Sequence, residues 1–132
     1  MRYLVDTHIL IRWLGDPHRL SKEQTRILEN LIRHQEPVGV SAASLVELAS
    51  LSCDASRVKR FNFEKIVFEL ETREAFVLLP ITPQITREAR VLVPILRDPA
   101  DTFIAATARA HGLRLLTSDT RIINANCVST VD

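Results

Sequence analysis

Short apolar runs alternate along this sequence with longer stretches whose apolar residues recur at helical spacing. A short apolar run between polar breaks is typical of a strand that is buried in a parallel sheet. Strands that alternate with helices form βαβ units, so we expect an α/β fold with a mostly parallel central sheet and helices on both of its faces. The expected strands are residues 3–5, 38–40, 77–79 and 113–116, with a short fifth at 127–130.

Local signals mark where several helices begin and end. Ser21 and Gln24 have the spacing of a capping box. Thr82 and Asp98 are N-cap residues, each followed by proline at the first helical position. Gly112 is a C-cap residue. The expected helices are residues 9–14, 41–52, 63–76 and 99–111, one that begins at 21 and one that runs from 83 toward 93.

Composition restricts the class of protein. The chain has 132 residues, of which 46% are hydrophobic and 25% are charged, and we expect a single globular domain over residues 1–132. The formal net charge of +1 means that any binding to a polyanion must use a local patch. An expected loop at 56–62 carries basic side chains that fit a nucleic-acid path, although a solvated loop is the commoner explanation. These basic residues are Arg57, Lys59 and Arg60.

Cysteine usage and hydropathy favour a reducing cytoplasm. Cys53 and Cys127 lie far apart and form no Cys-X-X-Cys pair, so a zinc site built on thiolates is not expected. Asp6 interrupts the only early apolar run, so we expect no signal peptide. No apolar stretch approaches the roughly 18 residues that span a bilayer. We therefore expect a cytoplasmic protein with no membrane partner.

Four acidic residues that are far apart in the sequence are expected to converge. Asp6 and Asp119 each follow an expected strand, and the carboxyl ends of parallel strands meet at one edge of a sheet. Asp101 shares the inward helical face of Ile104, and Glu47 is the only charge in a nearly apolar helix. Ionised carboxylates are costly to bury unpaired, and no matching buried lysine is expected. The sequence therefore predicts a cation among these acids.

A hard divalent ion with oxygen ligands, Mg²⁺ or Mn²⁺, is the natural counterion for such a group, as one ion or as two. It lowers the pKa of bound water, polarises phosphoryl oxygens and offsets charge on a leaving oxygen, as phosphodiester hydrolysis requires. The chain contains no Gly-rich phosphate loop and no Gly-X-Ser-X-Gly elbow, so metal-assisted hydrolysis is the simplest reaction class that remains. His8 adjoins Asp6 but has no second histidine nearby, and we interpret it as a packing or hydrogen-bonding residue.

Each acid also has a purely structural explanation. Asp6 can cap the helix that follows it, Asp98 is a plain N-cap, and Asp119 fits a turn. Asp101 lies at the third position of its helix, where the helix dipole favours a carboxylate by about 0.3–1 kcal/mol. Glu47 alone has no local explanation in its apolar helix. The functional interpretation therefore depends on the four acids together.

These motifs resemble those of the PIN-domain ribonucleases, and in particular the VapC-type toxins of bacterial and archaeal toxin–antitoxin pairs. The resemblance covers essentially the whole chain. Its most specific part is the third of four ordered segments. These segments are Leu-Val-Asp-Thr-His (4–8), Ser-Ala-Ala-Ser-Leu-Val-Glu (41–47), Asp-Pro-Ala-Asp-Thr-Phe-Ile-Ala-Ala-Thr-Ala (98–108) and Leu-Leu-Thr-Ser-Asp (115–119).

The resemblance implies a three-layer α/β/α fold and Mg²⁺- or Mn²⁺-dependent endonucleolytic cleavage of RNA. It also implies a homodimer and a cognate antitoxin whose tail covers the acidic groove. Thr7 and Thr117 match polar positions that support the family's site, whereas Thr102 departs from the pattern because many relatives have Arg after the third acid. The metal-binding, catalytic acids that the resemblance implies are Asp6, Glu47, Asp101 and Asp119.

Two other classes of function compete with a ribonuclease toxin. A phosphorylated receiver-type switch also gathers acids at strand ends, but it requires an acidic pair after the first strand and a late lysine, and the chain has no lysine after Lys65. A catalytically silent module of the same fold, which binds RNA or protein, would be favoured if one of the four acids were missing, and none is. Tight RNA binding without cleavage in the presence of metal would support the silent module.

Overall fold

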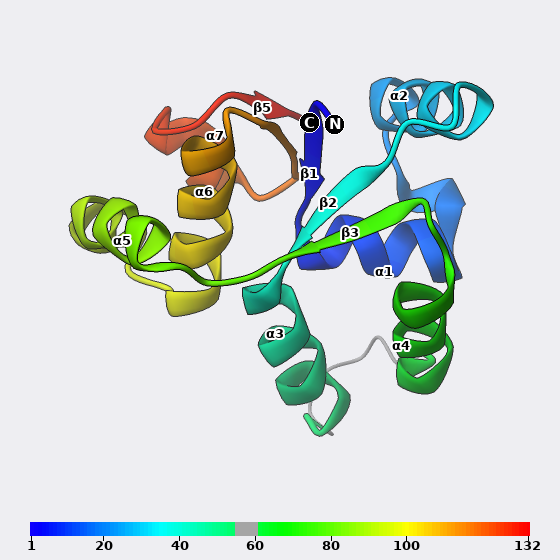
Figure 1. Cartoon of the computed structure of the whole chain (residues 1–132), viewed down its shortest axis with the longest axis horizontal. Helices are drawn as coiled ribbons and strands as arrows, with labels where there is room; N and C mark the ends of the chain where they lie inside the picture. Colours follow the sequence, from blue (N-terminus) through cyan, green and yellow to red (C-terminus); the bar gives the residue numbers. More distant parts are fainter. Residues whose placement is uncertain (55–60) are drawn as a thin grey trace.

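A sheet of five strands forms the centre of the protein, in a computed structural model that describes residues 1–54 and 61–132. The predicted basic residues of the loop at 56–62 lie outside the described residues. Each neighbouring pair of strands is parallel, which confirms the α/β prediction (Figure 1). The strands are β1 (Tyr3–Val5), β2 (Val38–Ser41), β3 (Phe76–Leu79), β4 (Arg114–Leu116) and β5 (Thr130–Val131), in the spatial order β3-β2-β1-β4-β5.

Helices connect the strands and cover the sheet. The predicted capping box is present, because the Ser21 side chain accepts from the Gln24 amide and the Gln24 side chain accepts from the Ser21 amide. Gly112 ends its helix in the left-handed conformation, with φ at 65°. The helices are α1 (Thr7–Gly15), α2 (Lys22–Arg33), α3 (Ala42–Ser52), α4 (Phe63–Thr72), α5 (Pro83–Leu96), α6 (Pro99–His111) and α7 (Thr120–Ala125), with a 3-10 turn at Pro17–Arg19.

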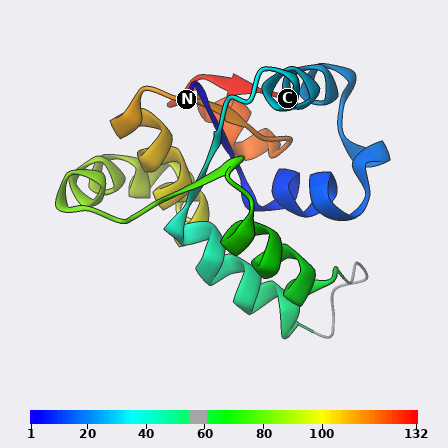
Figure 2. The same ribbon diagram turned by 45° about the vertical axis from the view of Figure 1, so that its right-hand side comes forward.

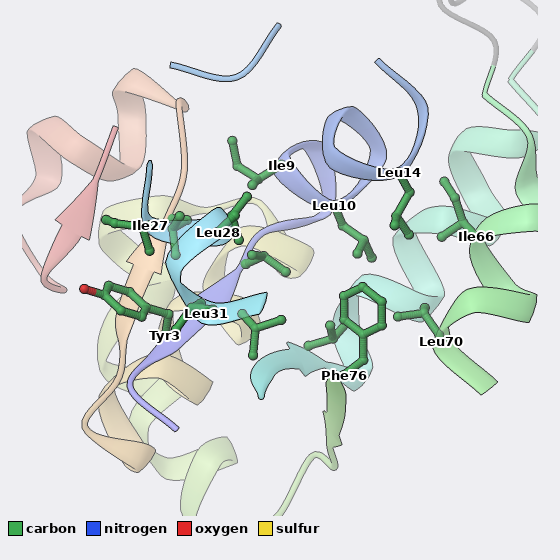
Figure 3. Close-up of a cluster of buried hydrophobic side chains, with 14 of the residues drawn as sticks. Tyr3, Ile9, Leu10, Leu14, Ile27, Leu28, Leu31, Ile66, Leu70 and Phe76 are labelled. Atoms are coloured by element: carbon green, nitrogen blue, oxygen red, sulfur yellow. The ribbon is translucent and has the colours of Figure 1, made fainter. Parts of the chain in front are cut away.

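The side chains of β1 show how the sheet separates two hydrophobic cores. Tyr3 and Val5 belong to a core that contains residues of α1, α2 and α4 (Figure 3). Leu4 belongs to a second core, on residues of α5, α6 and α7. Successive strand residues face opposite sides of a sheet, so this division places helices on both faces, as predicted. Figure 2 shows α3 and α4 side by side at one end of the molecule.

The end of α4 differs from the sequence prediction. The helix expected over 63–76 ends at Thr72, and Phe76 begins β3 instead. Phe76 is buried, its ring lies edge-on to that of Trp13 with the centroids 5.5 Å apart, and it is in register with Val38 of β2. Packing and strand pairing therefore place Phe76 in the sheet and not at the end of the helix.

Two features near the C-terminus also differ. The helix α7 was not predicted, and the strand expected at 127–130 is shorter and lies later in the chain, at Thr130–Val131. In the described part of the chain, none of the helices has both the length and the apolar character needed to cross a membrane.

Candidate metal centre

Asp6 lies where β1 ends and α1 begins. Its backbone N–H donates to the carbonyl of Leu116 at the end of β4, and its carboxylate accepts from the backbone N–H of Ile9 at 2.8 Å, so it caps α1. Only 5% of Asp6 is exposed. Burial raises the pKa of Asp6, and the charge of Glu47 raises it further, against the lowering effects of Thr117, the Ile9 amide and His8. The position of Asp6 therefore disfavours its ionised form.

The residue after Asp6 fixes the helix that carries Glu47. The Thr7 hydroxyl donates to Ser44 Oγ at 3.0 Å, and both side chains are buried. Ser44 lies one turn before Glu47 on the same face of α3. The bond therefore aligns α3 with the end of β1 and brings Glu47 close enough for its charge to act on Asp6. The support that was predicted for Thr7 has this physical basis.

The start of α6 supplies two carboxylates. Asp98 caps the helix by accepting from the Asp101 backbone N–H at 3.0 Å, as its sequence position predicted. Asp101 faces inward on the same helix, and its pKa is raised to about 7. The largest cause is burial, followed by the negative charges of Asp98, Asp119 and Glu47, while Arg121 lowers the pKa. Four carboxylates thus act on one another at this point.

Three of these acids form a compact group. One carboxylate oxygen from each of Glu47, Asp98 and Asp101 lies within 4.8 Å of the others, and all three residues are partly buried. Asp98 was expected only as a cap, and this second role was missed. The spacing of Asp98 and Asp101 could have indicated it, because an N-cap residue and the third helical residue both lie at the N-terminal end of a helix.

Asp119 lies at the edge of the group and is oriented by its own loop. Its backbone N–H donates to Thr117 Oγ1 at 3.1 Å, and its carboxylate caps α7 by accepting from the Arg121 N–H at 2.9 Å. The Arg121 guanidinium beside it holds the pKa of Asp119 below its usual value. Thr117 also bonds the Asp6 carboxylate, so one buried hydroxyl connects the ends of β1 and β4. Thr117 therefore contacts both acids, at a position where the family resemblance implies a supporting polar residue.

A buried glutamine braces this loop from α2. Gln24 is fully buried, and its side-chain amide donates to the Thr117 carbonyl at 3.4 Å and to Ser118 Oγ at 3.1 Å. The same side chain completes the capping box with Ser21. The loop that carries Asp119 is therefore tied to the N-terminus of α2. Sequence analysis identified Gln24 only as a capping residue.

His8 was interpreted from the sequence as a packing or hydrogen-bonding residue, and the structure argues against packing. Its side chain is exposed on α1, and its charge lowers the pKa of both Asp6 and Asp119. The sequence places His8 two residues after Asp6, but one residue could not show which side of α1 faces solvent.

The four predicted acids interact through their charges, but only two of them, Glu47 and Asp101, belong to the compact group. Glu47 and Asp101 share the compact group with Asp98, whereas Asp6 and Asp119 lie outside that group and interact with its members through their charge. Burial and mutual repulsion raise the pKa of Asp6 and of Asp101, and a cation among these carboxylates would relieve both effects. Carboxylate oxygens without histidine or cysteine fit a hard divalent ion such as Mg²⁺ or Mn²⁺.

Comparison with known proteins identifies relatives over almost the whole chain. The PIN domain family matches residues 3–126. The chain is 32% identical over 120 residues to Ribonuclease VapC22 of Mycobacterium tuberculosis, which covers 90% of this chain and 88% of that protein. The fold is also similar to that of VapBC2 from Rickettsia felis, with a TM-score of 0.71, 18% identity and coverage of 99% and 98% of the two chains. FitAcB from Neisseria gonorrhoeae gives a TM-score of 0.68, 23% identity and coverage of 98% and 96%.

Proposed function

Because this chain belongs to the PIN-domain family and to its VapC-type members, we propose that it is a metal-dependent endoribonuclease, the toxin of a toxin–antitoxin pair. Its substrate is RNA, and its metal is Mg²⁺ or Mn²⁺. The observation that carries the proposal is the convergence of carboxylates from separate elements on one edge of the sheet, two of them with raised pKa values. The name of the relative, a ribonuclease, supports RNA as the substrate class.

The proposed metal-binding and catalytic acids are the four predicted from the sequence, Asp6, Glu47, Asp101 and Asp119, with Asp98 added. A divalent ion at this site would polarise phosphoryl oxygens and activate a water for attack on phosphorus. The chain itself contributes fixed orientation. Asp6 is held by the Ile9 amide, Asp98 by the Asp101 amide and Asp119 by the Arg121 amide, so these carboxylates need little reordering when a cation and substrate arrive.

Cleavage of RNA by purified Asp101→Asn and Asp6→Asn variants tests the proposal. Asparagine keeps the shape of aspartate, and at position 6 it is an equally good N-cap residue for α1, so both variants are expected to fold while losing metal-dependent cleavage. A panel of structured RNAs is incubated with Mg²⁺, with Mn²⁺ or with EDTA, and the product ends are mapped. Asp16→Asn is the matched control, because Asp16 is exposed and its side chain makes no capping bond.

The outcomes separate the competing functions. Cleavage by the wild type and by Asp16→Asn, with none in EDTA or in the two site variants, supports the nuclease. Undiminished cleavage in EDTA would overturn the metal mechanism. Tight RNA binding by the wild type without cleavage in either metal would instead support the catalytically silent binding module.

We propose two protein partners, a second copy of the chain and an antitoxin. The structural relatives include VapBC assemblies and a toxin–antitoxin complex from Klebsiella pneumoniae, which supports an antitoxin partner. Exposed apolar side chains on α5, Val91, Val93 and Ile95, support self-association. Sedimentation velocity measures the dimer. Co-expression with the product of an adjacent small open reading frame tests the antitoxin, which should block RNA cleavage by covering the acids.

A further inference from the structure

Arg121 lies on the solvent-exposed side of the acid cluster, by which we mean Asp6, Glu47, Asp98, Asp101 and Asp119. Arg121 Nη2 donates to Asp119 Oδ2 at 2.9 Å and to Asp101 Oδ2 at 3.1 Å, and Nε donates to Asp119 Oδ1 at 3.2 Å. The guanidinium therefore grips Asp119 with two nitrogens and shares one of them with Asp101. Arg121 thereby links Asp101 of the compact group to Asp119, one of the two acids outside it.

These contacts are not needed to build the fold. The start of α7 is already capped by the bond between the Arg121 backbone N–H and Asp119. The Arg121 side chain is 67% exposed, whereas those of Asp101 and Asp119 are 14% and 20% exposed. Ion pairs with one partner so open to water contribute little to stability and exchange readily. The guanidinium is therefore a replaceable partner of these acids.

Arg121 binds Oδ2 of Asp101, and the carboxylate of Asp101 also offers an oxygen to the compact group with Glu47 and Asp98, where a divalent ion would bind. A carboxylate that donates its lone pairs to a metal gives up hydrogen bonds along those directions, and a guanidinium beside a divalent cation is repelled by it. Arg121 opposes the metal in both ways at Asp101. It can retain a bond to Asp119 and remain at the rim of the site, because the base of its side chain is anchored on α7. A guanidinium released at that position presents the planar fork that matches phosphate oxygens.

We propose that Arg121 is an internal counterion of the metal-free cluster, that metal binding displaces it from Asp101, and that the released guanidinium binds a phosphate oxygen of the RNA. Arg121 thus contacts either Asp101 or the substrate, according to whether metal is bound. This inference rests on the proposed ribonuclease function for the identity of the substrate. The exchange at Asp101 is independent of RNA and is tested separately.

The first arm of the test measures metal affinity without RNA. Mn²⁺ and Mg²⁺ are titrated calorimetrically into the wild-type protein, Arg121→Gln and Arg26→Gln. Arg26, on α2, is the matched control. Its side chain is 60% exposed, and two of its guanidinium nitrogens pair with Glu23 of the same helix. Loss of a competing exposed ion pair is expected to tighten metal binding by about three- to five-fold in Arg121→Gln, and to leave Arg26→Gln unchanged. Equal or weaker binding by Arg121→Gln would overturn the exchange.

The second arm measures RNA binding with and without metal. Fluorescence anisotropy of a short single-stranded RNA is recorded on ice, and the RNA is verified on a gel to be intact. With Mn²⁺ present, Arg121→Gln is expected to bind more weakly than the wild type, with a slope of log Kd against log salt that is smaller by about 0.7, the value for one phosphate contact on a single strand. Without metal the two proteins are expected to bind alike, because Arg121 is then held by the acids.

The results distinguish this inference from the proposed function. An equal loss of RNA affinity with and without metal would show that Arg121 contacts RNA without any exchange, which overturns the proposal. If neither protein bound RNA, the ribonuclease function and the phosphate contact would both be rejected. The metal titration would still decide whether Arg121 is the internal counterion.

Discussion

Replacing Asp101 with asparagine should stabilise the metal-free protein, and by more as the pH rises. Folding raises the pKa of Asp101 from 3.8 to about 7, so between these values the folded state binds more protons than the unfolded state. Stability therefore falls as the pH increases through this window, because ionising the buried carboxylate of Asp101, next to other acids, costs free energy. An asparagine side chain at this position carries no charge and is exempt from that loss, while Arg121 keeps its bonds to Asp119.

The size of the effect follows from the shift. Roughly three pKa units correspond to about 4 kcal/mol as an upper bound. Water at the open edge of the cluster and the nearby guanidinium screen the repulsion, so we expect about 1–2 kcal/mol at pH 8. In a chain of this length, that difference raises the melting temperature by roughly 3–8 °C. Only well below pH 3.8 should the difference vanish, because Asp101 is then neutral in both the folded and the unfolded state.

Thermal unfolding in EDTA between pH 4 and pH 8 measures this difference, with Asp16→Asn as the control. Adding Mn²⁺ should reverse the order of the two proteins at pH 8. A ligand at a hundred times its Kd stabilises by about 2.7 kcal/mol, and the wild type should gain most of that while Asp101→Asn gains little. Parallel melting curves for wild type and Asp101→Asn across the pH range would refute the electrostatic argument, and an equal gain from Mn²⁺ would refute the metal site.

Three further substitutions test the support of the site and the fold. Thr7→Val leaves Ser44 Oγ without its buried donor and should cost about 1–3 kcal/mol of unfolding free energy in urea. Gln24→Leu removes the hydrogen bonds to the Thr117–Ser118 loop and should also cost about 1–3 kcal/mol of unfolding free energy. The rise in melting temperature on adding Mn²⁺ should be smaller in this variant than in the wild type. Gly112→Ala meets no atom within 4 Å of the added methyl, so only its positive φ is penalised; guanidinium titration should show a loss of about 1–2 kcal/mol and calorimetry an unchanged metal affinity.

Features encoded by neighbouring residues could be predicted from the sequence. The capping box of Ser21 and Gln24, the N-cap at Asp98 and the C-cap at Gly112 depend on a few adjacent residues, and all are present. The convergence of the acids also followed from local information, because Asp6 ends one parallel strand and Asp119 follows another. The order of parallel strands did not need to be known for this inference.

Features that depend on distant contacts could not be predicted. Phe76 was expected to end a helix, but its ring packs on Trp13 and its backbone joins β2, and neither partner is close in sequence. The link from Arg121 to Asp101 spans 20 residues and two elements, one of which, α7, is too short to show a periodic pattern. Asp98 was assigned correctly as a cap, and nothing local indicated that Glu47 of α3 would lie beside it.

Three acids of the cluster are also the N-caps of helices, Asp6 for α1, Asp98 for α6 and Asp119 for α7. Each side chain therefore has a capping role beside its proposed metal-binding role, and asparagine can perform only the capping role. A single substitution of aspartate by asparagine at one of these caps would therefore remove a proposed metal ligand while the fold is kept. Asparagine at one of these three N-cap positions is thus the substitution to look for in a natural protein of this fold that does not cleave RNA.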